Sequence, residues 1–364
     1  MKPDFYLPIL KSKEGEFNAL ARLDAFTRNH ICPLLEVSRT EYDNEIGKKP
    51  KTLQDHLYNF CEKKFIGKWH SENSFIDTFL LDGQTVNGMS CMEYIFAHIY
   101  QTILQVVPMP VIHLNESLQQ RTGTSNVIQE YQVKEIGIRL LIEDAMDIRL
   151  EEKLQEILKY YDISYPNCHL IFDLADSDYT EYSDFAEGIV ALLNSFPNLD
   201  DWKSFTICAG AFPKSDLLKK GTNIVVRLDW KLFKLVRSGL NNTAVSRPIN
   251  YGDYSIVTPG HFEFDPRKMK RSANIRYTAG DNWIVLKGSA LQKPGDNAQY
   301  FEQAAEICGS SYYFGENYSK GDTHLKKCVL RQEKAGSPTI WNWVGNNHHF
   351  TAVIADLFSN PDGF

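Results

Sequence analysis

Six short apolar runs in this sequence each end at an ionisable residue. The side chains at those ends are Lys11, Glu36, Asp82, His113, Glu143 and Asp173. A helix-like stretch separates each run from the next, which is the pattern of parallel strands that are buried on both faces. Because α/β barrels place their working groups at the carboxyl ends of such strands, we expect these side chains to meet at one mouth.

Paired carboxylates with a lysine could carry two kinds of chemistry at such a mouth. They could bind a divalent metal ion, or they could donate and accept protons. If the protein is an enzyme, Lys11, Glu36 and Asp173 are the catalytic candidates, and Asp82 and His113 are ligand-binding candidates. The alternative is that these residues form ion pairs that hold the rim together. That alternative is favoured at any single position, whereas the two interpretations are balanced for the set.

Arg139 lies in the middle of the strand expected over residues 136–143. A buried guanidinium needs a carboxylate or a bound anion. Glu36 and Asp173 are the nearest carboxylates by topology, so we expect an internal salt bridge. The alternative is a phosphate or carboxylate ligand, which makes Arg139 a ligand-binding candidate.

Two further groups could bind a ligand. Asp173 and Asp176 form a D-x-x-D pair that can hold Mg²⁺, although a helix-capping acidic loop is the favoured interpretation. His348 and His349 follow a glycine and two asparagines near the end of the sequence. Adjacent histidines point to different faces of a helix, so they do not form a metal-binding pair at i and i+4. We expect one of them to face the mouth and the other to face solvent.

Seven strand–helix units precede residue 211 at barrel-like spacing. Their strands are expected over residues 6–11, 31–37, 75–82, 110–114, 136–143, 168–174 and 205–210, and the first helix over residues 16–28. For the eighth strand we predict residues 253–258, with 223–228 as the alternative. Two β-rich runs within residues 275–287 predict a hairpin, and helices are expected near 298–308, 324–331 and 347–358. The predicted fold is a TIM-like (β/α)8 barrel over about residues 1–260, with the C-terminal hairpin and helices packed on it as one domain, 1–364.

Bulk composition narrows the class of protein. The 364 residues carry a net charge of −7 and are 43% hydrophobic, so the chain can bury a large core and is not a strongly basic nucleic-acid binder. Its seven cysteines are dispersed without a C-x-x-C pair, which indicates reduced thiols in the cytoplasm. No signal peptide or membrane span is evident. P-loop, G-x-G-x-x-G, G-x-S-x-G and kinase motifs are absent from the sequence.

One basic cluster runs from Arg267 to Arg271, with Arg276 close by. Together with Tyr277 and Trp283, these basic residues could grip nucleic acid. A solvated loop is favoured, given the acidic balance of the whole chain.

The order of motifs along the chain resembles the Beta protein family of phage satellites and bacterial anti-phage defence islands. The motifs are the opening Tyr6-Leu-Pro-Ile-Leu-Lys11, Arg227-Leu-Asp-Trp230, Gly252-Asp-Tyr254, Arg276-Tyr-Thr278 with Trp283, Pro338-Thr-Ile-Trp341, and Gly345-Asn-Asn-His-His349. Five residues of these motifs are candidate ligand-binding positions: Arg227, Tyr277, Trp341, His348 and His349. The resemblance implies a gene beside that of a host-killing toxin called Gop, and a role in restraining that toxin. It carries no catalytic residues over to this chain.

Three functions remain open from the sequence. The first, which rests on the resemblance, is an antiviral defence protein in a toxin–antitoxin-like system that binds and regulates a partner toxin or another defence protein. The second is a barrel enzyme acting on a small phosphorylated or nucleotide-type ligand, with a divalent metal as a possible cofactor. The third is a nucleic-acid sensor that uses the basic cluster.

Overall fold

The computed structural model describes residues 4–40, 52–71, 73–103, 106–245, 247–260 and 271–358. The chain forms two compact units, each assembled from three segments. Unit 1 comprises Met1–Ser12, Ile31–Gly210 and Leu232–Tyr254, and unit 2 comprises Lys13–His30, Ala211–Lys231 and Ser255–Phe364. The organisation of residues 1–364 as one domain stays a prediction.

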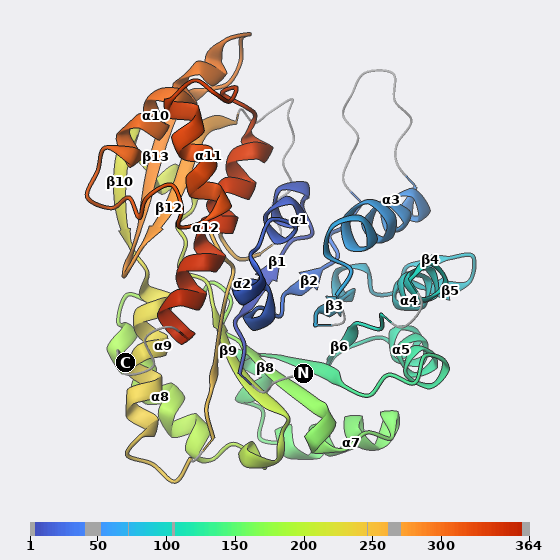
Figure 1. The fold of residues 1–364 in the computed structure, drawn as a ribbon. Helices are drawn as coiled ribbons and strands as arrows, with labels where there is room; N and C mark the ends of the chain where they lie inside the picture. The colour runs from blue at the N-terminus through green and yellow to red at the C-terminus, as the bar shows by residue number, and fades with distance from the viewer. Residues whose placement is uncertain are drawn as a thin grey trace. The chain divides into compact units, whose positions relative to one another are not determined.

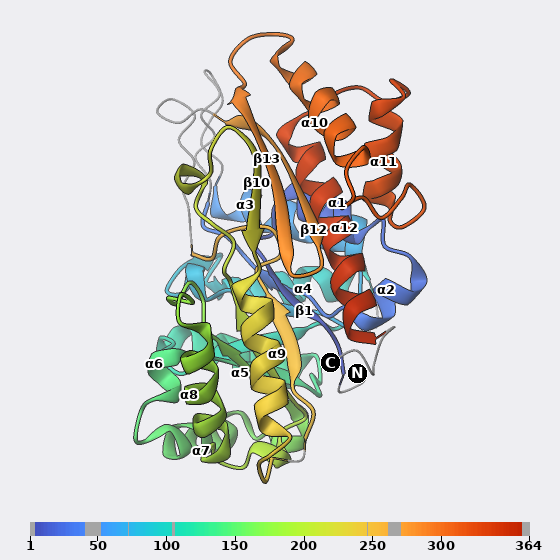
Figure 2. The same ribbon diagram turned by 90° about the vertical axis from the view of Figure 1, so that its left-hand side faces the viewer.

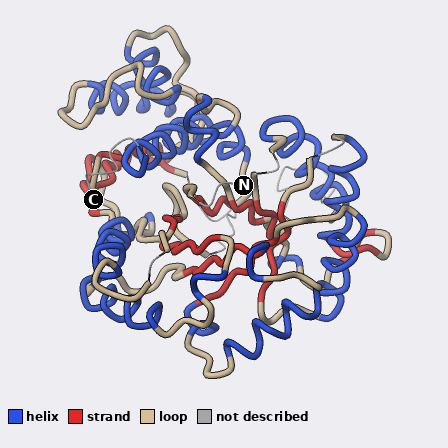
Figure 3. The backbone as a smooth tube through the Cα atoms, turned by 60° about the horizontal axis from the view of Figure 1, so that its bottom comes forward, coloured by secondary structure: helices blue, strands red, loops and turns tan. Residues whose placement is uncertain are grey.

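Unit 1 is a closed barrel of eight parallel strands, which confirms the α/β barrel fold. The order around the barrel is β1-β11-β9-β8-β7-β6-β3-β2, and Figure 3 shows the strands at the centre of a ring of helices. The strands are β1 (Leu7–Leu10), β2 (Leu34–Glu36), β3 (Phe75–Asp77), β6 (Met109–His113), β7 (Ile136–Leu141), β8 (Cys168–Asp173), β9 (Ser204–Ala209) and β11 (Asn250–Asp253). Almost every residue in them is buried, because helices cover the outer face while the strands fill the interior.

Helices connect successive strands of this barrel and begin at recognisable capping residues. Ser90 and Glu93 form a capping box at the start of α4, and the Ser117 hydroxyl caps α5. The helices are α3 (Leu53–Asn59), a π-helical continuation over Phe60–Trp69, α4 (Cys91–Thr102), α5 (Leu118–Glu130), α6 (Ile142–Ala145), α7 (Leu150–Tyr161), α8 (Tyr182–Asn194) and α9 (Leu228–Leu240). Short 3-10 turns lie at Phe79–Leu81, Tyr165–Asn167 and Leu199–Asp201, and β4 (Thr85–Val86) pairs with β5 (Met89–Ser90).

The eighth strand differs from both sequence predictions. Residues 253–258 overlap β11 only at Asp253, and residues 223–228 overlap β10 (Gly221–Val226), which belongs to unit 2. The true strand, Asn-Tyr-Gly-Asp, carries no apolar run, so periodicity cannot reveal it. This strand needs a glycine at position 252, because a Cβ atom there would lie 2.3 Å from the Cys208 Sγ atom and 2.8 Å from the Leu7 carbonyl oxygen.

The third strand and the first helix also differ from prediction. β3 ends at Asp77, and the apolar residues that follow it form the 3-10 turn Phe79–Leu81 rather than the rest of a strand. The first helix divides into α1 (Glu14–Leu20) and α2 (Ala25–His30), and both belong to unit 2. Apolar residues therefore marked the right segments, but they did not distinguish a strand from the tight turn that follows it.

Unit 2 is a three-stranded antiparallel sheet with helices packed against it (Figure 1, Figure 2). The sheet order is β10 (Gly221–Val226), β13 (Asn282–Ala290) and β12 (Ser272–Ala279), so the predicted hairpin is confirmed. The remaining elements are α10 (Gln299–Cys308), α11 (Lys320–Val329), α12 (Pro338–Phe358) and 3-10 turns at Ser215–Leu217 and Asp296–Ala298. Helix α12 begins nine residues before its predicted start at residue 347.

All seven cysteines are free thiols, and six of them are buried. Cys168 and Cys208 lie inside β8 and β9, as predicted. Among the described residues, no helix has the length and apolar content that a membrane crossing requires.

Candidate functional site

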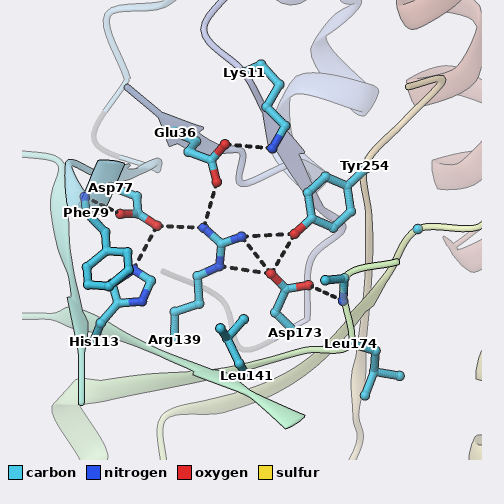
Figure 4. Close-up of polar contacts among 12 residues, drawn as sticks. Lys11, Glu36, Asp77, Phe79, His113, Arg139, Leu141, Asp173, Leu174 and Tyr254 are labelled. Carbon is cyan, nitrogen blue, oxygen red and sulfur yellow. Dashed lines mark hydrogen bonds and ion pairs between the residues drawn. The ribbon is translucent and has the colours of Figure 1, made fainter. Parts of the chain in front are cut away.

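Arg139 is the centre of a buried ionic cluster at the carboxyl end of the barrel (Figure 4). Its Nε and Nη2 atoms donate to Asp173 Oδ2 at 3.0 and 2.6 Å, and Nη1 donates to Glu36 Oε1 at 3.1 Å and Asp77 Oδ2 at 2.7 Å. Nη2 also donates to the Tyr254 hydroxyl at 3.0 Å. All five N–H groups of a guanidinium are thus engaged by protein acceptors, and the predicted salt bridge to Glu36 and Asp173 is confirmed.

Strand register delivers these side chains to one place. Glu36 of β2 is the register partner of Asp77 in β3, and His113 of β6 is the register partner of Arg139 in β7. Partners on neighbouring parallel strands point to the same side of the sheet. Lys11 follows β1, Asp173 ends β8 and Tyr254 follows β11, so seven of the eight strands contribute. We call Lys11, Glu36, Asp77, His113, Arg139, Asp173 and Tyr254 the Arg139 cluster.

The outer members of the Arg139 cluster complete the partners of its carboxylates. Lys11 Nζ donates to Glu36 Oε2 at 2.7 Å and lies 4.9 Å from the centre of the Tyr254 ring. The Tyr254 hydroxyl donates to Asp173 Oδ2 at 2.6 Å, while Asp173 Oδ1 accepts the backbone N–H of Ala175 at 2.9 Å. Each carboxylate oxygen therefore faces at least one donor, which is what burial of a carboxylate requires.

Asp77 and His113 form a pair on the opposite side of Arg139 from Asp173. His113 Nε2 lies 3.0 Å from Asp77 Oδ2, the His113 ring stacks on Phe79 at 4.2 Å, and Asp77 Oδ1 accepts the Phe79 N–H. Burial opposes ionisation of Asp77, but His113, Arg139 and the Phe79 amide outweigh it and hold the pKa of Asp77 well below its usual range. An ionised carboxylate can only accept, so the His113 Nε2 atom donates to Asp77.

Interactions within the Arg139 cluster also determine the charges of Arg139 and Tyr254. Burial alone would lower the pKa of Arg139, but Tyr254, Asp173, Asp77 and Glu36 raise it well above its ordinary value. Burial and the Asp173 carboxylate raise the pKa of Tyr254 well above its ordinary value. Arg139 is therefore a cation and Tyr254 a neutral hydroxyl at neutral pH.

Glu116 is a second buried acid beside His113. Its Oε1 atom accepts the His113 backbone N–H at 3.1 Å, whereas Oε2 is buried without a hydrogen-bond partner among the described residues. Burial raises the pKa of Glu116 to about 8, with Asp77 and Asp82 adding to the rise against the His113 amide and Arg121. Glu116 therefore holds its proton at neutral pH.

Two acids from the predicted rim set lie outside the Arg139 cluster. Asp82 follows the 3-10 turn and accepts hydrogen bonds from the Ser117 backbone N–H at 2.8 Å and hydroxyl at 2.5 Å, so it orients the cap of α5. Glu143 lies in the first turn of α6 and is exposed. Within the described ranges, no three His, Cys, Asp or Glu side chains are placed to hold a metal ion.

The other five candidates lie in unit 2, and all of them are buried. Arg227 Nη1 donates to the Gly280 carbonyl at 3.0 Å, and Trp341 Nε1 donates to the Ala335 carbonyl at 2.7 Å. His349 Nδ1 lies 2.7 Å from the Thr278 hydroxyl. The expectation that one of His348 and His349 faces solvent is wrong, because α12 buries both side chains completely. Binding of a ligand by any of the candidates stays a prediction.

His348 centres a second buried network, which we call the His348 cluster: His348, Asp322, Tyr277 and Ser319. His348 Nδ1 lies 2.7 Å from Asp322 Oδ2, and Nε2 lies 2.8 Å from the Thr278 carbonyl oxygen. The hydroxyls of Tyr277 and Ser319 donate to Asp322 at 2.8 and 2.6 Å. Both ring nitrogens of His348 therefore lie within hydrogen-bond distance of an oxygen atom. The His348 ring stacks on the Tyr277 ring, with 3.8 Å between the ring centres.

Part of the predicted basic cluster, residues 267–270, lies outside the described residues. Among its described neighbours, Arg276 is half-buried and donates to the Ile256 carbonyl at 3.0 Å, whereas Tyr277 and Trp283 are buried in the core of unit 2. Burial lowers the pKa of Arg276 to about 10. Those two aromatic rings cannot stack on bases while they are buried.

The family model described as Beta protein matches residues 6–355. The chain belongs to the Beta protein family. That match spans both units, from the residue before β1 to the last turns of α12. A comparison with curated proteins finds no match.

Sequence reasoning brought the right strands together but missed two members of the Arg139 cluster. Asp77 was hidden because apolar residues follow it as far as Leu81, which extended the predicted strand to Asp82, although Phe75-Ile-Asp77 already resembles the other strand ends. Tyr254 was visible only as part of the Gly252-Asp-Tyr254 motif. Its position directly after the eighth strand is the signal that would have found it, once that strand was placed correctly.

Proposed function

We propose that this Beta family protein restrains or regulates a partner toxin in an anti-phage defence system by binding it. The resemblance described above supplies the partner, and the family match over residues 6–355 supports it. The observation that carries the proposal is the closed Arg139 cluster. Every N–H group of Arg139 donates to an acceptor of the protein itself. Arg139 therefore has no donor for a substrate anion unless the cluster opens.

Co-expression with the toxin encoded beside this chain tests the proposal. Cells that carry both proteins should grow, whereas cells that carry the toxin alone should die. Purified chain and toxin should also form a complex in size-exclusion chromatography. Death in both cultures, or growth without any complex, would contradict restraint by binding.

A paired substitution tests whether the mouth of the barrel takes part in restraining the toxin. Lys11→Met with Glu36→Gln removes one cation and one carboxylate together, so neither charge is left buried alone. Under restraint by binding, protection should persist as long as the circular dichroism spectrum and the melting temperature remain close to those of the unchanged protein. Loss of protection in a folded double variant would favour chemistry at the mouth.

An enzyme acting on a small phosphorylated or nucleotide-type ligand is the second candidate, and the Asp77–His113 pair favours it. His113 Nδ1 has no hydrogen-bond partner among the described residues, and Lys11 Nζ has Glu36 as its single hydrogen-bond partner there. A histidine oriented by an ionised carboxylate is a general base in many enzymes. The catalytic assignment then moves from Glu36 and Asp173, which both bind Arg139, to His113 and Lys11.

Ligand binding separates the two functions. Inorganic phosphate, pyrophosphate and adenosine monophosphate, each with and without Mg²⁺, can be screened by thermal shift with the unchanged protein and with His113→Asn. A stabilisation that saturates with ligand and is lost in His113→Asn would support the enzyme. No shift with any of these ligands at millimolar concentration would count against that substrate class.

A further inference from the structure

Four apolar side chains stand exposed on two neighbouring connections at the carboxyl end of the barrel. They are Leu118, Leu141, Met146 and Ile148, with 73%, 36%, 69% and 100% of their surface accessible. β6 and β7 are adjacent in the barrel, so the connections that leave their ends are neighbours. We call these four residues the apolar rim. Exposed apolar groups gathered in one region of a folded protein mark an interaction site more often than scattered ones do.

Hydrogen bonds hold the apolar rim in place. Asp144 Oδ2 accepts the Leu141 N–H at 3.0 Å, and Asn115 Nδ2 donates to Asp144 Oδ1 at 3.3 Å, which ties the two connections together. Asp147 accepts the Arg149 N–H at 2.8 Å and pairs with Lys153 at 2.6 Å. Because this backbone is already ordered, binding of a partner does not have to order it, which lowers the entropy cost of association.

The surroundings of the apolar rim are acidic. Residues 143–153 contain five carboxylates and two cations, and one of those cations, Lys153, is already paired with Asp147. Glu143, Glu151 and Glu152 are exposed. A partner that covers the apolar side chains must also approach these charges, so a basic partner is attracted and an acidic one is repelled.

We infer that the apolar rim binds a basic amphipathic helix of the partner toxin. This inference rests on the proposed function and adds the surface and the chemistry of its partner. A helix presents an apolar stripe flanked by lysine or arginine, which matches apolar side chains bordered by carboxylates. Two copies of this chain would bring like charges together across a symmetric contact, and an anionic membrane would be repelled by the same carboxylates.

Substitutions in the apolar rim test the inference on the full chain. Met146→Glu and Ile148→Glu each place a charge on an exposed position, so folding should be unaffected. The matched control is Leu217→Glu in unit 2, where 72% of the side chain is accessible. We expect each rim variant to weaken toxin binding by about tenfold or more, as for the central residues of an interface, and the control to change it less than about twofold. Binding should also weaken as salt is raised.

Photo-crosslinking identifies the occupant. Benzoylphenylalanine at position 148 should form an adduct with a lysine- or arginine-rich amphipathic helix of the toxin, and the same group at position 217 should not. Unchanged affinity of the rim variants overturns the inference but leaves the proposed function standing. An adduct with an acidic or non-helical segment overturns it as well. The inference is also overturned if Ile148→Glu turns a dimer of this chain into a monomer. Binding of the protein to vesicles of anionic lipid would overturn it too. A toxin that the unchanged protein does not bind overturns both proposals.

Discussion

The Arg139 cluster and the His348 cluster consist of similar side chains that different structural elements supply. Each places an arginine or histidine side chain against a buried carboxylate, and in each a tyrosine hydroxyl donates to that carboxylate: Tyr254 to Asp173, and Tyr277 to Asp322. Seven barrel strands or their ends supply the Arg139 cluster. The His348 cluster comes from β12, α11 with its cap Ser319, and α12. Barrel strands place the donors around the buried acids of the first cluster, whereas a strand and two helices place them in the second. Both kinds of element can therefore stabilise a buried acid in this protein.

The two clusters differ in the side chain at their centre. Arg139 is charged at every accessible pH and binds three carboxylates. His348 contacts one carboxylate, that of Asp322. Removing the central side chain should therefore deprive three carboxylates of a common partner in the barrel, whereas a single carboxylate would lose a partner in the His348 cluster. The predictions below test this ranking.

Arg139→Met should have the largest effect. Three buried carboxylates would lose their common partner, so we expect the free energy of unfolding to fall by about 3–5 kcal/mol, measured by urea denaturation at pH 7. Arg139→Lys, which keeps the charge but has fewer donors, is the control and should lose less. A loss below about 1 kcal/mol in Arg139→Met, the range of an exposed ion pair, would show that the cluster does not stabilise the barrel.

Asp322→Asn should have the next largest effect. The substitution replaces the carboxylate that His348, Tyr277 and Ser319 contact by an amide, and we expect a loss of about 2–3 kcal/mol in the free energy of unfolding. A double-mutant cycle with His348→Gln isolates the pair. Losses that simply add in the double variant would mean that His348 and Asp322 do not interact, and would remove the basis for comparing the two clusters.

Glu116→Gln should change the pH dependence of stability. The pKa of Glu116 is raised to about 8 in the folded protein, against about 4.3 in an unfolded chain. Between these values the folded state keeps a proton that the unfolded state releases, so Glu116 makes stability fall as pH rises through this window. The lowered pKa of Asp77 acts oppositely and costs stability only as pH falls below about 4.

The glutamine variant removes the Glu116 contribution. Relative to the unchanged protein, it should be more stable by about 1–3 kcal/mol at pH 8.5 and nearly equal at pH 4.5, by urea denaturation at both pH values. Glu143→Gln, at an exposed carboxylate, is the matched control. Parallel pH profiles for the unchanged and Glu116→Gln proteins would refute a proton held at Glu116.

The tyrosine pair should give the smallest and most similar effects. Tyr254 accepts from Arg139 and donates to Asp173, and Tyr277 accepts from the Phe314 N–H and donates to Asp322. Tyr254→Phe and Tyr277→Phe should each lower the free energy of unfolding by about 1–2 kcal/mol. If one loss exceeded the other severalfold, the equivalence of the two hydroxyls would be wrong.

Much of unit 1 could be predicted, because barrel strands show in the sequence as apolar runs that end at polar residues. Continuous apolar runs located seven strands, and Arg139 in mid-strand predicted its own partners. The failures share one cause: β11 and the end of β3 are fixed by contacts with neighbouring strands rather than by their own residues. The burial of His348 and His349 was missed because a polar, aromatic stretch suggests an exposed surface. Their partners, Asp322 and Thr278, are too far away in sequence for local pattern to reveal.

The position of β1 has a consequence for synthesis of the chain. Leu7 pairs with Gly252, and Asn347 donates to the carbonyl of Ala19 at 3.1 Å. The first strand and the first helix therefore emerge from the ribosome long before the segments that cover them. Late, long-range pairing of this kind slows folding and leaves apolar surface open to chaperones. A polypeptide released before its last helix would keep β1 in a finished barrel but leave α1 uncovered, an obvious mark for proteolysis.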